Sequence, residues 1–393
     1  MTGSAMAGPT PETQSQRTLR NIPSISAGSF LTMPTQSRGR RRFRSKSFVG
    51  RAAQKAVQKS KQRTWIIPLI LLTICIGWYL LDPTGSPVRY GIFLSYPVPG
   101  TDPVEYAKGP LDFVFCIFYA LVFSFTREFV MQEILEPLGK HYNIRNQAKL
   151  RRFEEQAYTF LYFSVMGIWG LCVMRKTPMW YFNTYAFWEE YPHYTHVASF
   201  KAFYLVEAAY WIQQALVLAL QLEKPRKDFK ELVMHHIITL LLIGCSYVFH
   251  FTWIGLAVFI TMDTSDILLA FTKCLNYLNV SVVYISFLIF VFVWIYMRHY
   301  LSLKIIWAVL TTMATVNSFE LNWKAGYYKC WLSQYGTAFL LISLQVINLY
   351  WLFLILRIGY RAFTTQDTHD ERSDDEDEGS SVEREPSNAK KEE

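Results

Sequence analysis

Hydrophobic residues in this chain gather into long runs that are separated by shorter polar segments. The runs are roughly 17 to 22 residues long, and a helix of that length crosses a hydrocarbon core of ~30 Å. The pattern therefore predicts an all-α polytopic membrane protein with about eight transmembrane helices. The predicted spans are residues 65–81, 111–126, 157–174, 202–222, 232–250, 254–273, 280–297 and 336–357.

Two parts of the pattern carry further predictions. The spans 232–250 and 254–273 are separated by only a few residues, so we expect them to form an antiparallel helical hairpin. The connection 298–335 contains a further apolar stretch, IIWAVLTTMATV. Because this stretch is too short to cross a membrane comfortably, the connection is predicted to be re-entrant or interfacial.

Composition agrees with a membrane location. Hydrophobic residues make up 51% of the chain and charged residues only 18%, whereas soluble domains average about 25% charged residues. The six cysteines show no CxxC or metal-type spacing, so we interpret them as small apolar residues without a disulfide framework.

The two ends of the chain differ from its centre. Residues 1–63 contain thirteen Lys or Arg residues and a single acidic residue, Glu12, while the last thirty residues contain twelve acidic and four basic residues. Neither end has the apolar content to build a core, so residues 1–63 and 363–393 are predicted to be disordered tails. The N-terminal membrane helices then occupy residues 64–149, and the main domain residues 150–362. The basic tail favours a topology signal or contact with anionic membrane lipids over nucleic-acid binding.

Charged loops predict the orientation in the membrane. The N-terminal tail and the segments 127–156 and 223–231 are rich in Lys and Arg, whereas residues 82–110 contain only two such residues. The positive-inside rule therefore places both termini in the cytosol. Lys391 and Lys390 lie at the third and fourth positions from the C-terminus, which matches a dilysine signal for return to the endoplasmic reticulum.

Polar residues inside predicted spans indicate function, because ionisable groups are costly in a bilayer. His235 and His236 lie in one arm of the hairpin, and Asp263 and Asp266 share a side of the other arm. His236 lies sixteen residues before the turn at Thr252 and Asp266 fourteen after it, so their depths differ by roughly 3 Å. We therefore expect the histidines to meet at least one aspartate.

Further polar side chains predict a cavity within the bundle. Four of them repeat on one face of the span 202–222, and two share a face of the last span. At least four spans thus point polar groups inward. The predicted cavity residues are Glu207, Tyr210, Trp211, Gln214, Ser246, Tyr247, Gln345 and Asn348.

Several chemistries suit these groups. A metal site is disfavoured, because adjacent residues on a helix diverge by ~100° and the usual His spacings are absent. A proton-coupled transporter is a second alternative, and histidines held only by hydrogen bonds within the bundle are a third. Acyl transfer is favoured, because an imidazole acts as base or nucleophile and a carboxylate orients it.

The run from residue 226 to residue 278 contains the double histidine followed by D-x-x-D, and the elements SYVFH and LNYL flank these residues. This run resembles the longevity-assurance motif of ceramide synthases. Residues 150–362 resemble the wider TLC domain, which ceramide synthases share with translocation-chain-associated membrane proteins. Met262 stands where animal members usually have a histidine, and no homeobox-like insert is present. The resemblance is therefore to the fungal form.

This resemblance implies transfer of a fatty acyl group, of very long chain, from acyl-CoA to a sphingoid base, with His235, His236, Asp263 and Asp266 in the catalytic site. It implies a TLC-type helical barrel, no cofactor beyond the co-substrate acyl-CoA, and no metal. Our mechanistic hypothesis is an acyl-histidine intermediate, with Asp266 orienting or charge-balancing an imidazole. Either histidine could be the nucleophile.

Other predictions concern partners and regulation. The basic residues Arg226, Lys227 and Lys230 are predicted to contact CoA phosphates. The resemblance also implies a small single-span accessory subunit, and a homodimer or a heterodimer with a paralogous synthase. Ser47 follows basic residues and Ser373 precedes acidic ones, so both are predicted phosphorylation sites. The main alternative is a non-enzymatic TLC-domain protein, such as a translocation helper, lipid sensor or transporter.

Overall fold

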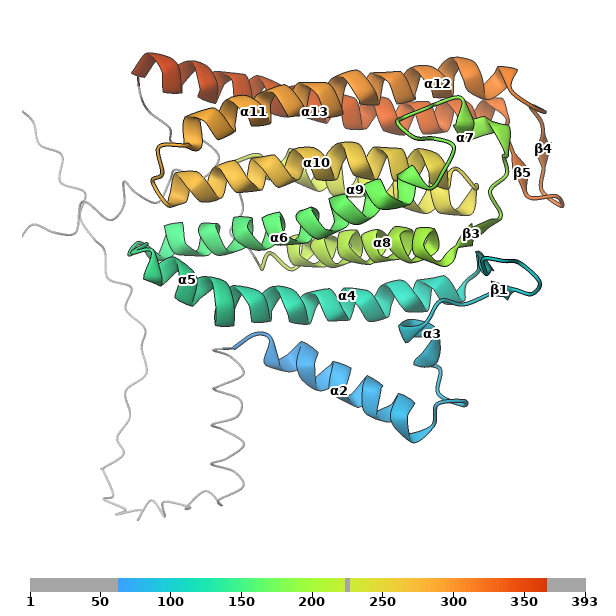
Figure 1. Ribbon diagram of the computed structural model, residues 1–393, viewed down its shortest axis with the longest axis horizontal. Coiled ribbons are helices and arrows are strands. Elements are labelled where there is room, and N and C mark those ends of the chain that lie inside the picture. Colours follow the sequence, from blue (N-terminus) through green and yellow to red (C-terminus); the bar gives the residue numbers. More distant parts are fainter. Residues whose placement is uncertain (1–62, 223–226, 366–393) are drawn as a thin grey trace, which may run out of the picture. The chain divides into compact units, whose positions relative to one another are not determined.

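Long helices dominate the structure (Figure 1). The fold comes from a computed structural model, which describes residues 63–222 and 227–365. Within these ranges, seven helices are long and apolar enough to cross a membrane, and a shorter apolar helix, α2 (Ile66–Leu81), precedes them. The predicted class, an all-α polytopic membrane protein with about eight spans, is confirmed.

The seven long helices include two that pass through a π-helical turn. The first joins α4 (Leu111–Phe129), η1 (Val130–Leu135) and α5 (Glu136–His141), and another joins α11 (Val283–Ile295), η2 (Tyr296–Leu301) and α12 (Ser302–Thr315). The other five are α6 (Gln147–Arg175), α8 (Ala198–Ala219), α9 (Phe229–Val248), α10 (Thr252–Tyr277) and α13 (Trp331–Thr365). Two short helices complete the helical elements of the described residues: α3 (Arg89–Ile92) and α7 (Ala186–Glu189).

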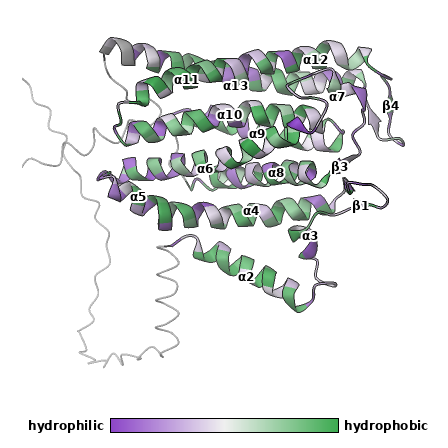
Figure 2. Ribbon diagram, viewed as in Figure 1, coloured by the Kyte–Doolittle hydropathy of each residue, from purple (hydrophilic) through white to green (hydrophobic). Residues whose placement is uncertain are grey.

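Six helices close into a ring. In order around it, α6 contacts α8, α8 contacts α9, α9 contacts α13, α13 contacts α12, and α10 packs against both α12 and α6. Helix α4 lies outside this ring against α8, and α2 and α3 pack on α4. Apolar residues run along most of the helical length, and hydrophilic residues gather around α5 (Figure 2). The ring is therefore a helical barrel, as the resemblance implied.

The prediction of a re-entrant segment in the 298–335 connection is wrong. Residues 283–315 form one helix of 33 residues, and the stretch IIWAVLTTMATV lies almost wholly within α12. Arg298 and His299 follow directly after the predicted span 280–297, but both side chains are buried, at 2% and 8% exposure. They lie in the π-helical turn η2, a feature that is frequent at functional sites.

Short strands lie at one end of the barrel, which we call the sheet end. Strands β1 (Pro97–Val98), β2 (Glu105–Ala107) and β3 (Thr195–Val197) form an antiparallel sheet, in which Tyr106 pairs with Pro97 and His196. A second antiparallel pair, β4 (Leu321–Asn322) and β5 (Tyr327–Tyr328), connects α12 to α13. The sheet end also contains the turn between α9 and α10.

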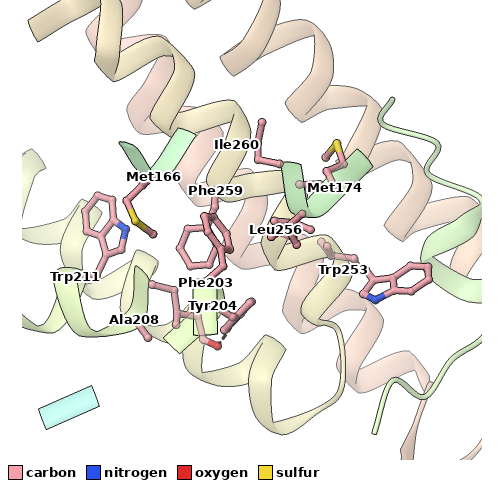
Figure 3. Close-up of a cluster of buried hydrophobic side chains, with 14 of the residues drawn as sticks. Met166, Met174, Phe203, Tyr204, Ala208, Trp211, Trp253, Leu256, Phe259 and Ile260 are labelled. Carbon is pink, nitrogen blue, oxygen red and sulfur yellow. Dashed lines mark hydrogen bonds between the residues drawn. The ribbon is translucent and has the colours of Figure 1, made fainter. Parts of the chain in front are cut away.

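The predicted antiparallel hairpin is present as α9 and α10, with a turn at residues 249–251. Helix α9 ends because the Phe251 amide donates to the Ser246 carbonyl at 2.8 Å and His250 adopts a positive φ of 63°. Gly255 then lets α10 approach α8, since a Cβ there would lie 2.6 Å from the Tyr204 hydroxyl oxygen. Figure 3 shows the aromatic core beside this contact, where Phe259 lies close to Phe203 and Tyr204.

Candidate functional site

The adjacent histidines lie on α9, inside the barrel. His235 is buried, with 7% exposure, and its ring lies 5.5 Å from the ring of Trp211 and 5.1 Å from that of Trp351. The His236 ring also contacts Trp211, at 5.6 Å, and stands nearly perpendicular to the His235 ring. Both imidazoles therefore contact Trp211 of α8, and His235 also contacts Trp351 of α13.

A mostly apolar cavity, the larger cavity, extends from His235 toward the sheet end. On α9 it is bordered from His235 through Thr239 to Ser246, and eleven residues of helix correspond to ~16 Å. The remaining wall is mostly aliphatic and aromatic side chains of α8, α10 and α13. Of the two histidines, His235 lines this cavity. The site can therefore hold a long apolar chain that ends beside an imidazole.

A hydrogen bond fixes the tautomer of His236. Its Nδ1 lies 2.9 Å from the carbonyl oxygen of Leu232, one helical turn earlier, and this acceptor requires a proton on Nδ1. In the neutral ring the basic lone pair is consequently on Nε2. His236 can act as a base through that nitrogen.

Two carboxyl groups are buried together between α8 and α10. Asp263 of α10 and Glu207 of α8 are fully buried and interact electrostatically with each other and with Tyr162 of α6. Among the described residues, none of their four carboxyl oxygens is engaged in a well-formed hydrogen bond. Two adjacent buried carboxylates repel each other strongly, so such a pair holds at least one proton. The pair can exchange a proton during a reaction.

Asp266 has a different partner from the one we expected. Its Oδ1 accepts from Arg298 Nη2 at 2.6 Å, so the predicted pairing of this carboxylate with an imidazole is wrong. The guanidinium also donates to Ser265 Oγ at 2.6 Å and to Asn348 Oδ1 at 3.1 Å, and lies over the Trp294 ring. Arg298 lies in the predicted 298–335 connection, so spacing along the hairpin gave no sign of this partner.

The structure distributes the predicted cavity residues over several places. Trp211 and Ser246 line the larger cavity, and Gln345 and Asn348 line a smaller one beside it. Tyr210 stacks on Tyr162 with ring centroids 3.5 Å apart. The other three are placed as follows: Glu207 beside Asp263, Gln214 against Gln213, and Tyr247 at the sheet end against Asp112.

A second buried polar group lies at the sheet end, outside the predicted site. Lys201 Nζ forms an ion pair with Asp112 Oδ1 at 2.7 Å, and both side chains are buried. Nearby, burial and the positive charge of Lys201 lower the pKa of Lys108 to about 7. Burial likewise lowers the pKa of His250 to about 4 and that of His193 to about 3. These basic groups are therefore far less readily charged than in water.

Some predicted residues cannot be placed. Arg226, Ser47, Ser373, Lys390 and Lys391 lie outside the described residues. Lys227 precedes α9, and Lys230 lies in its first turn. Within the described ranges, no three His, Cys, Asp or Glu side chains come together as a possible metal-binding group.

Comparison with known proteins identifies the protein family. Residues 152–357 match the family model of the TLC domain, which covers the six helices of the barrel. The chain is 72% identical over 378 residues to sphingosine N-acyltransferase lac1 of Schizosaccharomyces pombe, covering 96% of this chain and 97% of that protein. It is 45% identical over 332 residues to ceramide synthase LAG1 of Saccharomyces cerevisiae, covering 84% and 80%. The chain therefore belongs to the fungal sphingosine N-acyltransferase, or ceramide synthase, family of TLC-domain membrane proteins.

Proposed function

We propose that this protein transfers a fatty acyl group from acyl-CoA to the amine of a sphingoid base, forming ceramide and CoA at His235 and His236. One observation supports this most directly: a long apolar cavity ends beside His235, where an acyl chain would present its thioester. The family relationship supports the same substrates. A preference for very long acyl chains stays a prediction.

In the proposed mechanism His235 is the nucleophile, because it lines the larger cavity. A ring nitrogen attacks the thioester carbonyl, the carbon–sulfur bond breaks, and CoA leaves as the thiolate. The neutral sphingoid amine then attacks the acyl-imidazole, which forms the amide and releases the imidazole. The amine gives up one proton, which His236 Nε2 accepts and passes to the CoA thiolate. The overall reaction is thioester plus amine to amide plus thiol.

The remaining assignments are part of the same proposal. Asp263 stabilises charge and proton transfer at the histidines, and Asp266 acts through Arg298 as a positioning residue. Arg226, Lys227 and Lys230 hold CoA phosphates near the start of α9. We further propose an endoplasmic reticulum location with both termini in the cytosol, which the basic loops and the C-terminal lysine pair support. An accessory subunit and dimerisation stay predictions.

The test measures amide formation and adduct formation separately. Membranes with wild-type protein should N-acylate a labelled sphingoid base, whereas His235→Ala and His236→Ala should lose activity by roughly 10³-fold. Purified wild type incubated with acyl-CoA alone should gain an acyl adduct on His235, detected by peptide mass spectrometry.

A matched control is His141→Ala, which removes an exposed histidine at the end of α5 and should keep activity within about twofold. Undiminished amide formation in the His235 and His236 variants would overturn the catalytic assignment. If wild type forms no amide at all, the non-enzymatic alternative is favoured. Amide formation without any adduct would favour direct attack by the amine on the thioester.

A further inference from the structure

His235 and His236 are held in place in different ways. The His236 ring donates from Nδ1 to the Leu232 carbonyl oxygen at 2.9 Å, so a hydrogen bond fixes its orientation. The buried Nδ1 of His235, by contrast, has no hydrogen-bond partner among the described residues. The χ2 torsion of a histidine has broad minima, so packing must restrict it where no such bond does. The orientation of His235 therefore depends on the side chains that contact its ring.

Two tryptophans from different helices contact the His235 ring. The ring centroid of Trp211 on α8 lies 5.5 Å from that of His235, and the ring centroid of Trp351 on α13 lies 5.1 Å from it. Each indole plane is inclined by 66° to the imidazole, which is the edge-to-face geometry that aromatic pairs favour. Two helices of the barrel therefore contribute directly to the position of this imidazole.

The two tryptophans differ in how firmly they are held. Trp351 Nε1 donates to Asp228 Oδ2 at 3.1 Å, and the two residues are buried, at 7% and 4% exposure. In the described part of the chain, Trp211 Nε1 has no hydrogen-bond partner. Trp351 also belongs to a buried apolar cluster with Phe290 and Ile355. Trp351 is therefore the more firmly fixed of the two indoles that contact His235.

Asp228 and His235 belong to the same helix. Asp228 directly precedes α9, and its carbonyl oxygen accepts from the Leu232 amide at 3.0 Å. The seven residues from Asp228 to His235 make about two helical turns, which places both side chains on one face, ~10 Å apart along the axis. A single indole of α13 thus contacts this face at two points, with its Nε1 at the carboxylate and its ring at the imidazole.

We propose that Trp351 and Asp228 are positioning residues for the nucleophile: Trp351 orients the His235 ring, and Asp228 acts through Trp351 by fixing its indole. This assignment rests on the proposed N-acyltransferase function at His235. The alignment of a nucleophile matters because a displacement of ~1 Å can cost about 100-fold in rate. Loss of the Asp228 hydrogen bond should therefore slow acyl transfer without weakening the binding of acyl-CoA.

The first part of the test measures amide formation by purified full-length protein. Asp228→Leu removes the acceptor for Trp351 Nε1, so kcat should fall about tenfold while the KM for acyl-CoA stays within about twofold. Asp228→Asn keeps an acceptor oxygen and should recover most of the activity that Asp228→Leu loses. Trp351→Phe should lose at least as much as Asp228→Leu. Because Asp228 acts through Trp351, the double variant should lose no more than Trp351→Phe alone.

The second part uses labelling with diethyl pyrocarbonate, which needs no acyl transfer. This reagent modifies neutral imidazoles, and peptide mass spectrometry compares His235 with His196, a buried histidine of β3 at the sheet end. In Asp228→Leu and Trp351→Phe, labelling of His235 should rise relative to that of His196. General unfolding would raise the labelling of both histidines together. That result in both variants would overturn the positioning role.

Trp331→Phe is the matched control, because Trp331 is an exposed tryptophan on the same helix as Trp351. This variant should keep kcat within about twofold and the labelling of His235 unchanged. Undiminished kcat in Asp228→Leu and Trp351→Phe would overturn the proposal, as would equal losses in Asp228→Leu and Asp228→Asn. If wild type forms no amide, the underlying N-acyltransferase function fails, whereas the labelling still tests how His235 is held.

Discussion

The barrel contains two buried polar groups that differ in how completely they are paired. At the sheet end, Lys201 Nζ contacts Asp112 at 2.7 Å and donates to the carbonyls of Ser95 and Ala107. The other oxygen of Asp112 accepts from the Gly109 amide and from the Tyr247 hydroxyl. The carboxyl oxygens of Asp263 and Glu207, by contrast, form no well-formed hydrogen bond among the described residues.

The difference indicates which group serves structure and which serves chemistry. Burying a charge is costly unless ion pairs and hydrogen bonds compensate it. At the sheet end, one Asp112 oxygen has the ion pair with Lys201 and the other accepts two hydrogen bonds. This sheet-end group fixes α4 and α8 to each other and to β2. The Asp263–Glu207 pair is incompletely paired, which costs stability and is typical of groups that take part in chemistry. Three predictions test this comparison.

The largest effect is expected from breaking the sheet-end ion pair. Lys201→Met leaves Asp112 buried without its cation, so it should lower the free energy of unfolding by about 3–5 kcal/mol. Thermal unfolding in detergent measures this change. The double variant Lys201→Met, Asp112→Leu should recover most of the loss. A single variant as stable as wild type would contradict a structural role for this pair.

Asp263→Asn should lower the activity without lowering the free energy of unfolding. It removes a poorly paired buried carboxyl group, so the stability should be unchanged or higher. Activity should fall by about 100-fold, equivalent to ~2.7 kcal/mol of transition-state stabilisation. Amide formation and thermal unfolding are measured on the same preparation. A large loss of stability with little loss of activity would show that Asp263 belongs with the structural group.

The smallest effect is a pH dependence at the sheet end. Burial lowers the pKa of His193 to about 3 in the folded protein, so this ring stays neutral while the unfolded chain takes up a proton below about pH 6.5. Stability should therefore fall as the pH drops from 6.5, by about 1.4 kcal/mol per pH unit for this histidine. His193→Phe keeps the stacking on Trp253 and should weaken the acid sensitivity. Unchanged acid sensitivity would contradict a neutral His193.

Much of the architecture could be predicted from the order of residues. Apolar runs of membrane-spanning length predicted the helices, and the short link near Thr252 predicted the α9–α10 hairpin. Both follow from local patterns, because each helix satisfies its own backbone hydrogen bonds and must cover them with apolar side chains. The same logic failed at Arg298, since a charged residue suggests a membrane surface unless its partner is known.

Hydropathy and spacing along the chain encode the class of protein, the helices, the hairpin and candidate groups such as His235 and Asp263. The pairing of side chains came from the fold: Asp266 with Arg298 and Gln345 with His299. It also decided that two cavities with different chemistry share one wall at Met262. These outcomes depend on how each helix is rotated about its axis and on the π-helical turn η2, and packing between distant segments sets both.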